Sequence, residues 1–193
     1  MPKLVDAVAA RRDICEAARS VFARRGVAGT GLTHVADAAG MGRSSLYHYY
    51  PDKPTLLRDL VKRVLDEELA VFVGVLRGEG APAERVEKLA RGLVALLDEY
   101  AAAFRMMFDL RLRDAPRFKS FFRKIRAELA AVIAEGQRRG EFDRALEPDL
   151  AASTLIGAID GLVFQHFADG RAFPRLDALG DEVTRLLRKA LAP

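Results

Sequence analysis

The chain has 193 residues, of which half are apolar and 30% are charged, and its formal net charge at pH 7 is +4. This length and apolar fraction are sufficient for the core of one large domain or two small ones, and they argue against a disordered chain. The small positive balance does not by itself identify a class of partner.

The excess positive charge lies in the first quarter of the chain. Residues 1–53 contain 8 Lys and Arg against 5 Asp and Glu, whereas residues 54–193 contain 23 against 22. DNA phosphates would favour such a local excess, although ordinary solvation of a surface explains so small a difference equally well.

The single cysteine, Cys15, excludes an intramolecular disulfide and fits a reducing compartment. It shares a helical face with Ile14, Ala18 and Phe22, which favours a buried apolar role for the thiol. The N-terminus has no apolar signal-peptide core, and no uninterrupted apolar run approaches the length of a membrane span. We therefore expect a soluble, cytoplasmic protein that does not contact a membrane.

The first predicted helix runs from Arg11 to Arg25, with an apolar stripe on one side and Gly26 as its end. Residues 1–10 are expected to form a loosely held arm. Such an arm could contact a DNA backbone, although a frayed terminus is the simpler interpretation.

The stretch from Leu32 to Lys53 has the pattern of two short helices that cross through a tight turn. Thr30 or Gly31 is expected to cap the first of them, and Pro51 limits the second, which begins at Arg43, to about Tyr50. The inward positions have helical spacing, and a glycine stands where a left-handed turn residue is needed. These inward residues are Val35, Ala36, Ala39, Gly40, Met41, Leu46 and Tyr49.

The remaining chain is predicted to be helical throughout, because no segment shows the alternation of a strand. Asp52 should cap a long helix that reaches about Leu76, and residues 77–82 form the clearest loop. Further helices are predicted over 83–103, over 104–113, from about 118 until Gly140, over 148–167 and from about 176 to 190. The fold class is therefore all-α, with about nine helices.

At this point the sequence resembles the TetR family of transcriptional regulators. The resemblance rests on AxxAGMGRSSLYHYYPDKPTLL, on the preceding helix that ends FARRG, and less specifically on EGQRRGEF and the later Asp160-Gly161 pair. It implies an all-helical homodimer that binds a pseudo-palindromic operator, usually as a repressor, and releases DNA when a small ligand enters the C-terminal domain. The chain departs from the family pattern at Gly31 and Gly42, where small hydroxyl residues are common, and at Tyr50, where Phe is usual.

The outward residues of the helix-turn-helix are the candidate DNA contacts. Arg43 could read a guanine or hold a phosphate, the latter being the more common role, and Lys53 and Thr33 should reach phosphates. The resemblance assigns Tyr47 and His48 to the DNA backbone or a thymine methyl. The DNA-binding set is Thr33, Arg43, Ser44, Ser45, Tyr47, His48 and Lys53.

Two-fold pairing is expected because one helix-turn-helix reads too few bases to find an operator. The last two helices are the candidates, since one carries a line of small residues and the other a Leu/Val stripe. Both stripes could instead face the core of their own protomer. The predicted dimer interface is Ala151, Thr154, Ala158, Gly161, Leu179, Val183 and Leu186.

The second part of the chain contains more aromatic and flexible apolar residues than a minimal bundle needs, although most must be ordinary core. The resemblance implies that some line a pocket for a small apolar or aromatic effector, whose binding would move the fourth helix. The predicted pocket residues are Leu65, Leu69, Phe72, Leu93, Leu97, Tyr100, Phe104, Met107, Phe108, Phe118 and Phe122.

We assign residues 1–53 to DNA binding and residues 54–193 to effector binding and dimerisation. The sequence has no catalytic set, no glycine-rich phosphate loop and no metal-ligand spacing, since His34 and His166 belong to no cluster. We therefore expect neither an enzyme nor a cofactor or metal. An architectural DNA-binding protein without an effector remains an alternative, as does, less favourably, a helical small-molecule-binding protein or an enzyme.

Overall fold

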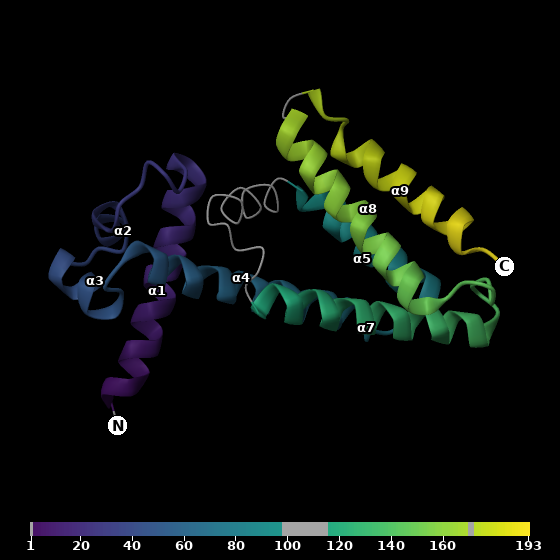
Figure 1. Cartoon of the computed structure of the whole chain (residues 1–193), viewed down its shortest axis with the longest axis horizontal. Coiled ribbons are helices and arrows are strands. Elements are labelled where there is room, and N and C mark those ends of the chain that lie inside the picture. Colours follow the sequence, from purple (N-terminus) through teal and green to yellow (C-terminus); the bar gives the residue numbers. More distant parts are fainter. Residues whose placement is uncertain (1, 98–115, 170–171) are drawn as a thin grey trace. The chain divides into compact units, whose positions relative to one another are not determined.

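The computed structural model describes residues 2–97, 116–169 and 172–193, and those residues form helices without any strand (Figure 1). This confirms the predicted all-α class, with eight helices in the described residues against the nine expected for the whole chain. The helices are α1 (Pro2–Arg25), α2 (Leu32–Ala38), α3 (Arg43–Tyr49), α4 (Lys53–Leu76), α5 (Pro82–Ala95), α7 (Pro116–Arg139), α8 (Pro148–Asp169) and α9 (Leu176–Leu191).

The chain divides into two compact units, and the division falls within α4 between Leu65 and Asp66. Helices α1, α2, α3 and the first part of α4 belong to the first unit. The rest of α4 and helices α5, α7, α8 and α9 belong to the second.

The core of the first unit lies where α1 packs on α2 and α3. Ala18, Ala36 and Leu46 are fully buried there, and the methyl side chain of Ala36 lets the helices approach closely. Gly40 has a φ of +65°, a left-handed conformation that costs little only for glycine. The predicted helix-turn-helix is therefore present, with α2 and α3 on the two sides of this turn.

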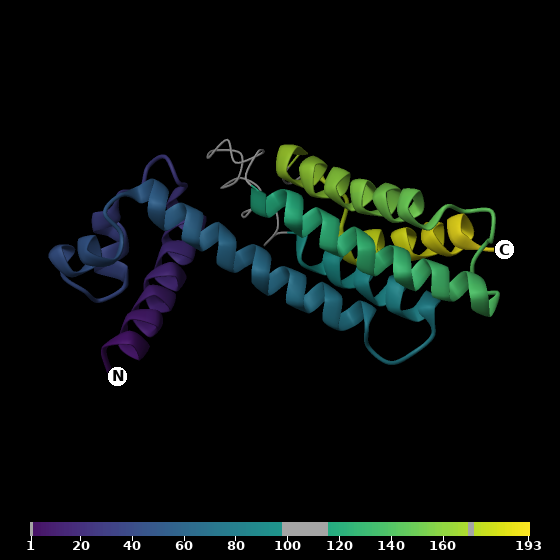
Figure 2. The ribbon, with the colours of Figure 1, turned by 60° about the horizontal axis from the view of Figure 1, so that its bottom comes forward.

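The second unit is a helical bundle in which α8 lies beside α7 and α9 lies beside α5 (Figure 2). Its larger buried cluster includes Phe72 and Leu76 from α4 together with Leu129 and Ile133 from α7. A smaller cluster contains Val94, Leu97 and Val163, and residues of α9 pack against it.

The EGQRRGEF segment forms the corner between α7 and α8. The Phe142 ring is buried directly against Gly136, where a Cβ atom would overlap it. The Gln137 side chain donates hydrogen bonds to the carbonyl oxygens of Asp143 and Leu146, at 2.8 and 2.7 Å. The segment therefore holds the connection between the helices in one conformation.

The prediction of a loosely held arm over residues 1–10 is wrong, because α1 begins at Pro2. Proline is tolerated in the first helical turn, and the residues from Leu4 to Ala10 include good helix formers. The first helix is consequently nine residues longer than the sequence pattern indicated.

The helix predicted over 83–103 ends earlier, at Ala95. Leu96 leaves helical geometry, with φ −101° and ψ 11°, and Leu97 after it is fully buried. Apolar periodicity in the sequence does not reveal a non-helical backbone conformation at a single residue such as Leu96. Residues 98–103 of this prediction and the piece predicted over 104–113 lie outside the described residues.

The prediction that Tyr49 is the buried aromatic at the end of α3 needs correction. Tyr49 is half-buried, whereas Tyr50 is 0% exposed. Helix α3 ends at Tyr49, and Tyr50 adopts an extended conformation with φ −137° and ψ 100°. This change of direction turns the Tyr50 ring into the core.

Candidate nucleic-acid interface

The outward residues of α3 form an exposed polar face on the first unit. Leu46 is buried below them and fixes which side of this short helix faces inward. Tyr47 is 50% exposed, so its side chain is accessible from solvent. The exposed residues of the predicted DNA-binding set are Arg43, Ser44, Ser45, Tyr47 and His48, and Thr33 on α2 is half-buried.

Gly31 and Gly42 are the N-cap residues of α2 and α3, and the two helices differ in whether a side chain takes part in the cap. The Gly31 N–H donates to Nδ1 of His34 at 3.1 Å, so the imidazole takes part in capping α2. The Thr30 hydroxyl instead donates to the carbonyl oxygen of Gly26 at 2.7 Å. At Gly42 no side chain of the described residues caps α3. The capping contribution of His34 was not recognisable from the usual list of capping residues.

Lys53 has an internal contact in addition to its predicted role at DNA. Its ammonium group donates to the carbonyl oxygen of Val27, in the loop between α1 and α2. Next to it, Asp52 accepts the Thr55 N–H at 2.7 Å, which confirms Asp52 as the cap of α4. The hydrogen bonds from Thr55 lower the pKa of Asp52. An ammonium has three donors, so the contact with Val27 leaves Lys53 able to bind a phosphate as well.

Tyr50 lies at the centre of a polar cluster that the sequence did not indicate. Its hydroxyl donates to Oδ2 of Asp59 at 2.5 Å and lies 3.5 Å from Sγ of Cys15. The guanidinium of Arg11 stacks on its ring, 4.9 Å from the centroid. Burial raises the pKa of the Tyr50 phenol and of the Cys15 thiol, so both stay protonated. The need for a partner was foreseeable from Tyr50, but Asp59 as that partner was not.

The predicted effector-pocket residues that the structure describes lie in different packing environments. Phe72 is part of the larger core cluster and makes an edge-to-face contact with Phe121, which sequence reasoning left out of the pocket. Leu69 and Leu93 pack against the same cluster, while Leu97 belongs to the smaller one. Leu65 is buried in the first unit, Phe118 is half-buried, Phe122 is exposed, and Tyr100, Phe104, Met107 and Phe108 lie outside the described residues.

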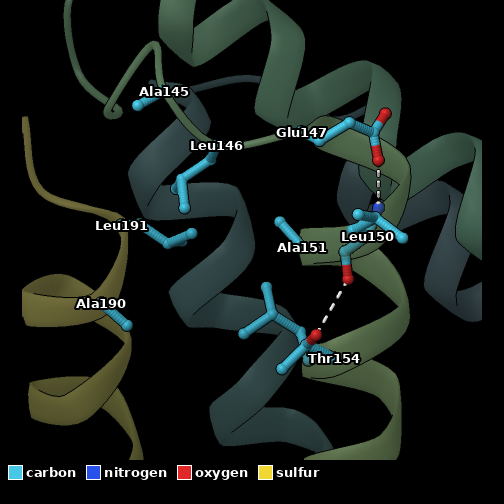
Figure 3. Close-up of a pocket in the computed structure, with 9 residues that line it drawn as sticks. Ala145, Leu146, Glu147, Leu150, Ala151, Thr154, Ala190 and Leu191 are labelled. Atoms are coloured by element: carbon cyan, nitrogen blue, oxygen red, sulfur yellow. Dashed lines mark hydrogen bonds between the residues drawn. The ribbon is translucent and has the colours of Figure 1, made fainter.

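The described residues show a groove elsewhere in the second unit, between the start of α8 and the end of α9 (Figure 3). Its volume is about 410 Å³. At its edge, Glu147 accepts the Leu150 N–H at 2.7 Å, and the Thr154 hydroxyl donates to the Leu150 carbonyl oxygen at 2.9 Å. The lining residues are Ala145, Leu146, Glu147, Leu150, Ala151, Thr154, Leu155, Ala190 and Leu191. They include none of the predicted pocket residues, but Ala151 and Thr154 belong to the predicted dimer interface.

The predicted dimer residues fall into an outward and an inward group. Thr154, Ala158 and Leu186 are exposed, and Ala151 and Gly161 are half-buried. Leu179 and Val183 pack against the smaller core cluster of their own chain. Sequence reasoning missed two large exposed apolar residues of α8, Leu150 and Phe164.

Among the described residues, α8 is long and apolar enough to cross a membrane by length and composition, which is weak support for a span, because helices of soluble proteins pass the same test. Only 11% of its apolar window is buried within the chain. No group of three or more His, Cys, Asp or Glu that could hold a metal ion occurs in the part of the chain that the structure describes.

The sequence is similar to known bacterial regulators over both parts of the chain. Residues 14–60 match the family described as bacterial regulatory proteins, tetR family, and residues 111–192 match the C-terminal part of BetI-type transcriptional repressors. The HTH-type transcriptional repressor Rv1474c of Mycobacterium tuberculosis is 27% identical over 98% of this chain and 100% of its own. The repressor KstR2 of the same organism is 28% identical over 78% of each chain.

The fold is likewise similar to solved structures. A TetR-family regulator from Mesorhizobium loti superposes with a TM-score of 0.79, covering 97% of this chain and 98% of the other at 22% identity. At that identity the likeness concerns the fold.

Proposed function

Since the chain belongs to the TetR family of bacterial regulatory proteins, whose similar members are named transcriptional repressors rather than enzymes, we propose that it represses transcription by binding a pseudo-palindromic operator as a homodimer. A small, largely apolar effector releases it from DNA. Membership of this family by itself indicates a DNA-binding transcriptional regulator.

The exposed face of α3 is the observation that carries the proposed DNA contact. A recognition helix presents its N-terminal residues to base edges and its flanks to phosphates. Arg43, at the start of α3 and exposed, can pair with guanine O6 and N7, a contact that discriminates between bases by roughly 1 to 3 kcal/mol, or it can hold a phosphate. Ser44, Ser45, Tyr47 and His48 complete this surface.

The two parts of the chain have separate roles in this proposal. Residues 1–53 bind DNA, with Thr33 and Lys53 at phosphates, and residues 54–193 bind the effector and pair the protomers. The protein works in the cytoplasm, where the DNA lies.

The apolar surface of α8 and α9 supports pairing with a second copy. Leu150 and Phe164 on α8 and Leu186 on α9 are exposed in the single chain, and isolated soluble proteins seldom leave so apolar a helix as α8 uncovered. The small residues Ala158 and Gly161 would let a partner helix approach closely. Sedimentation equilibrium tests this directly: a dimer at micromolar concentration supports the proposal, and a monomer contradicts it.

An apolar effector is supported by the composition around α4, α5 and α7 and by the name of one relative. KstR2 is described as a ketosteroid transcriptional regulator. Titrating the operator complex with a varied ligand library, steroids included, should release DNA with some apolar compounds. If no compound releases DNA, the architectural DNA-binding protein becomes the better interpretation.

Selection from random duplex oligonucleotides tests the proposed function with the purified full chain. The expected result is an enriched inverted repeat whose half-sites lie one helical turn, or a multiple of it, apart. Recovery of duplexes without any shared sequence would contradict operator recognition.

A further inference from the structure

Two helices of the first unit, α1 and α4, contribute side chains that contact Tyr50, which directly follows α3. Asp59 of α4 accepts the phenolic hydrogen at 2.5 Å, and Cys15 of α1 lies 3.5 Å from the same oxygen. Arg11, also on α1, covers the ring. The side chain is fully buried, so the hydroxyl has no access to water. Its orientation is therefore fixed by partners within the protein.

Tyr50 contacts both of the elements that flank the loop of residues 50–52. It is the first residue after α3, and its N–H donates to the Leu46 carbonyl oxygen at 2.9 Å, so its backbone moves with that helix. Asp59 lies in the second turn of α4. The hydrogen bond therefore links the C-terminal end of α3 to α4 across the loop of residues 50–52.

The neighbouring ion pair of Asp59 does not duplicate this link. The Arg63 guanidinium is 4.0 Å from the Asp59 carboxylate, which is beyond hydrogen-bond distance. Both Asp59 and Arg63 are on α4, so their ion pair does not hold α3. A Phe in place of Tyr50 would fill the same volume but would provide no donor for the carboxylate.

We propose that the Tyr50–Asp59 hydrogen bond is a latch that fixes α3 on α4, and that Tyr50 is a positioning residue for recognition of the operator. This inference rests on the proposed DNA binding through α3. In this proposal, recognition of the operator sequence depends on one buried hydroxyl group that does not itself contact DNA.

The latch should matter more for base recognition than for general attachment to DNA. Hydrogen bonds to base edges require a defined helix orientation in the major groove, whereas long cationic side chains reach phosphates from a range of orientations. A recognition helix that is free to tilt would therefore lose affinity mainly for its own operator.

The test compares dissociation constants of full-length variants on the selected operator and on a scrambled duplex of equal length. Tyr50→Phe and Asp59→Ala should each weaken operator binding by roughly tenfold, and the double variant should be no weaker than either, as expected of two residues that share one interaction. Binding to the scrambled duplex should change by less than about twofold. Asp59→Asn, which retains an acceptor oxygen, should recover most of the lost affinity.

Tyr49→Phe is the matched control, because it removes a hydroxyl from the adjacent, half-buried tyrosine and should leave operator affinity within about twofold of the wild type. Equal weakening on both duplexes, or additive losses in the double variant, would overturn the latch.

Hydrogen exchange of the DNA-free protein separates this inference from the proposed function. In Tyr50→Phe the amides of residues 43–50 should exchange faster, while those of Ile125 to Ile133 in α7 of the second unit should not. If the wild-type protein enriched no DNA sequence, the proposed function would be wrong. Hydrogen exchange would still measure whether the Tyr50–Asp59 hydrogen bond holds α3. Unchanged exchange over residues 43–50 would overturn the latch whatever the DNA result.

Discussion

The ammonium group of Lys53 donates a hydrogen bond to the carbonyl oxygen of Val27, 26 residues earlier in the chain. This contact ties the first residue of α4 to the loop that leads from α1 into the helix-turn-helix. The residue that we propose to bind a phosphate beside α3 therefore also stabilises the fold of the first unit.

Replacing Lys53 should affect stability and DNA binding in separable ways. We expect Lys53→Ala to lower the free energy of unfolding by roughly 1 to 3 kcal/mol, because a buried carbonyl loses a charged donor. The slope of log K against log salt should fall by about one unit if the same ammonium also neutralises a phosphate. Denaturant titration and binding at several salt concentrations measure the two effects.

Lys119→Ala is the control for Lys53, since it removes an exposed lysine from α7 and should change neither quantity. A lower stability with an unchanged salt slope would restrict Lys53 to its structural role.

The contact between Gly136 and Phe142 predicts a selective loss of stability. Gly136→Ala would place a methyl group inside the Phe142 ring, and the displaced ring should cost about 1 to 3 kcal/mol of unfolding free energy. Gly74→Ala is the matched control, because a Cβ atom there meets nothing within 4 Å. It should stabilise α4 by roughly 0.5 to 1 kcal/mol through the higher helix propensity of alanine. Thermal unfolding that moves in the same direction for both variants would contradict this explanation.

Asp160 on the apolar helix α8 predicts an unusual pH dependence. The residue as a whole is exposed in the single chain, but its carboxyl group is partly desolvated, and this raises its pKa from 3.8 to about 6. A folded-state pKa above the unfolded value means that the folded protein binds the proton more tightly. The resulting stabilisation is fully present below pH 3.8 and is lost as the pH rises through about 6.

Asp160→Asn removes this titration and should therefore raise the melting temperature at pH 7.5. The advantage over the wild type should shrink as the pH approaches 4.5, where the wild-type carboxyl is also neutral. Comparing the two proteins cancels the contributions of other carboxylates. A difference in melting temperature that does not change with pH would show that Asp160 is not the titrating group.

The helix-turn-helix was predictable because its determinants are local. Gly40 is needed for a left-handed turn, Ala36 for a close helix crossing, and Leu46 for the buried side of α3. Each of these requirements depends on residues a few positions away, so helical spacing and backbone sterics suffice to identify them. The ends of α4 and α9 were predictable for similar reasons.

The features that the sequence did not reveal depend on distant partners or on backbone direction. Tyr50 rather than Tyr49 is buried, because α3 ends one residue before the periodic pattern does. The acceptors of Tyr50 and Lys53, which are Asp59 and Val27, are set by how helices pack. His34 takes part in capping α2 by accepting the Gly31 N–H, a role for which histidine is not among the preferred residue types.

The central proposal is that the exposed face of α3 reads the operator. A single substitution that removes one positive charge from this face tests the proposal most directly. Arg43→Ala should weaken binding to the selected operator by roughly 5- to 150-fold, the equivalent of about 1 to 3 kcal/mol. Arg126→Ala, which removes the same charge from an exposed position on α7, should bind the operator as the wild type does. If Arg43→Ala binds the operator as tightly as the wild type, this face of α3 is not the operator-reading surface.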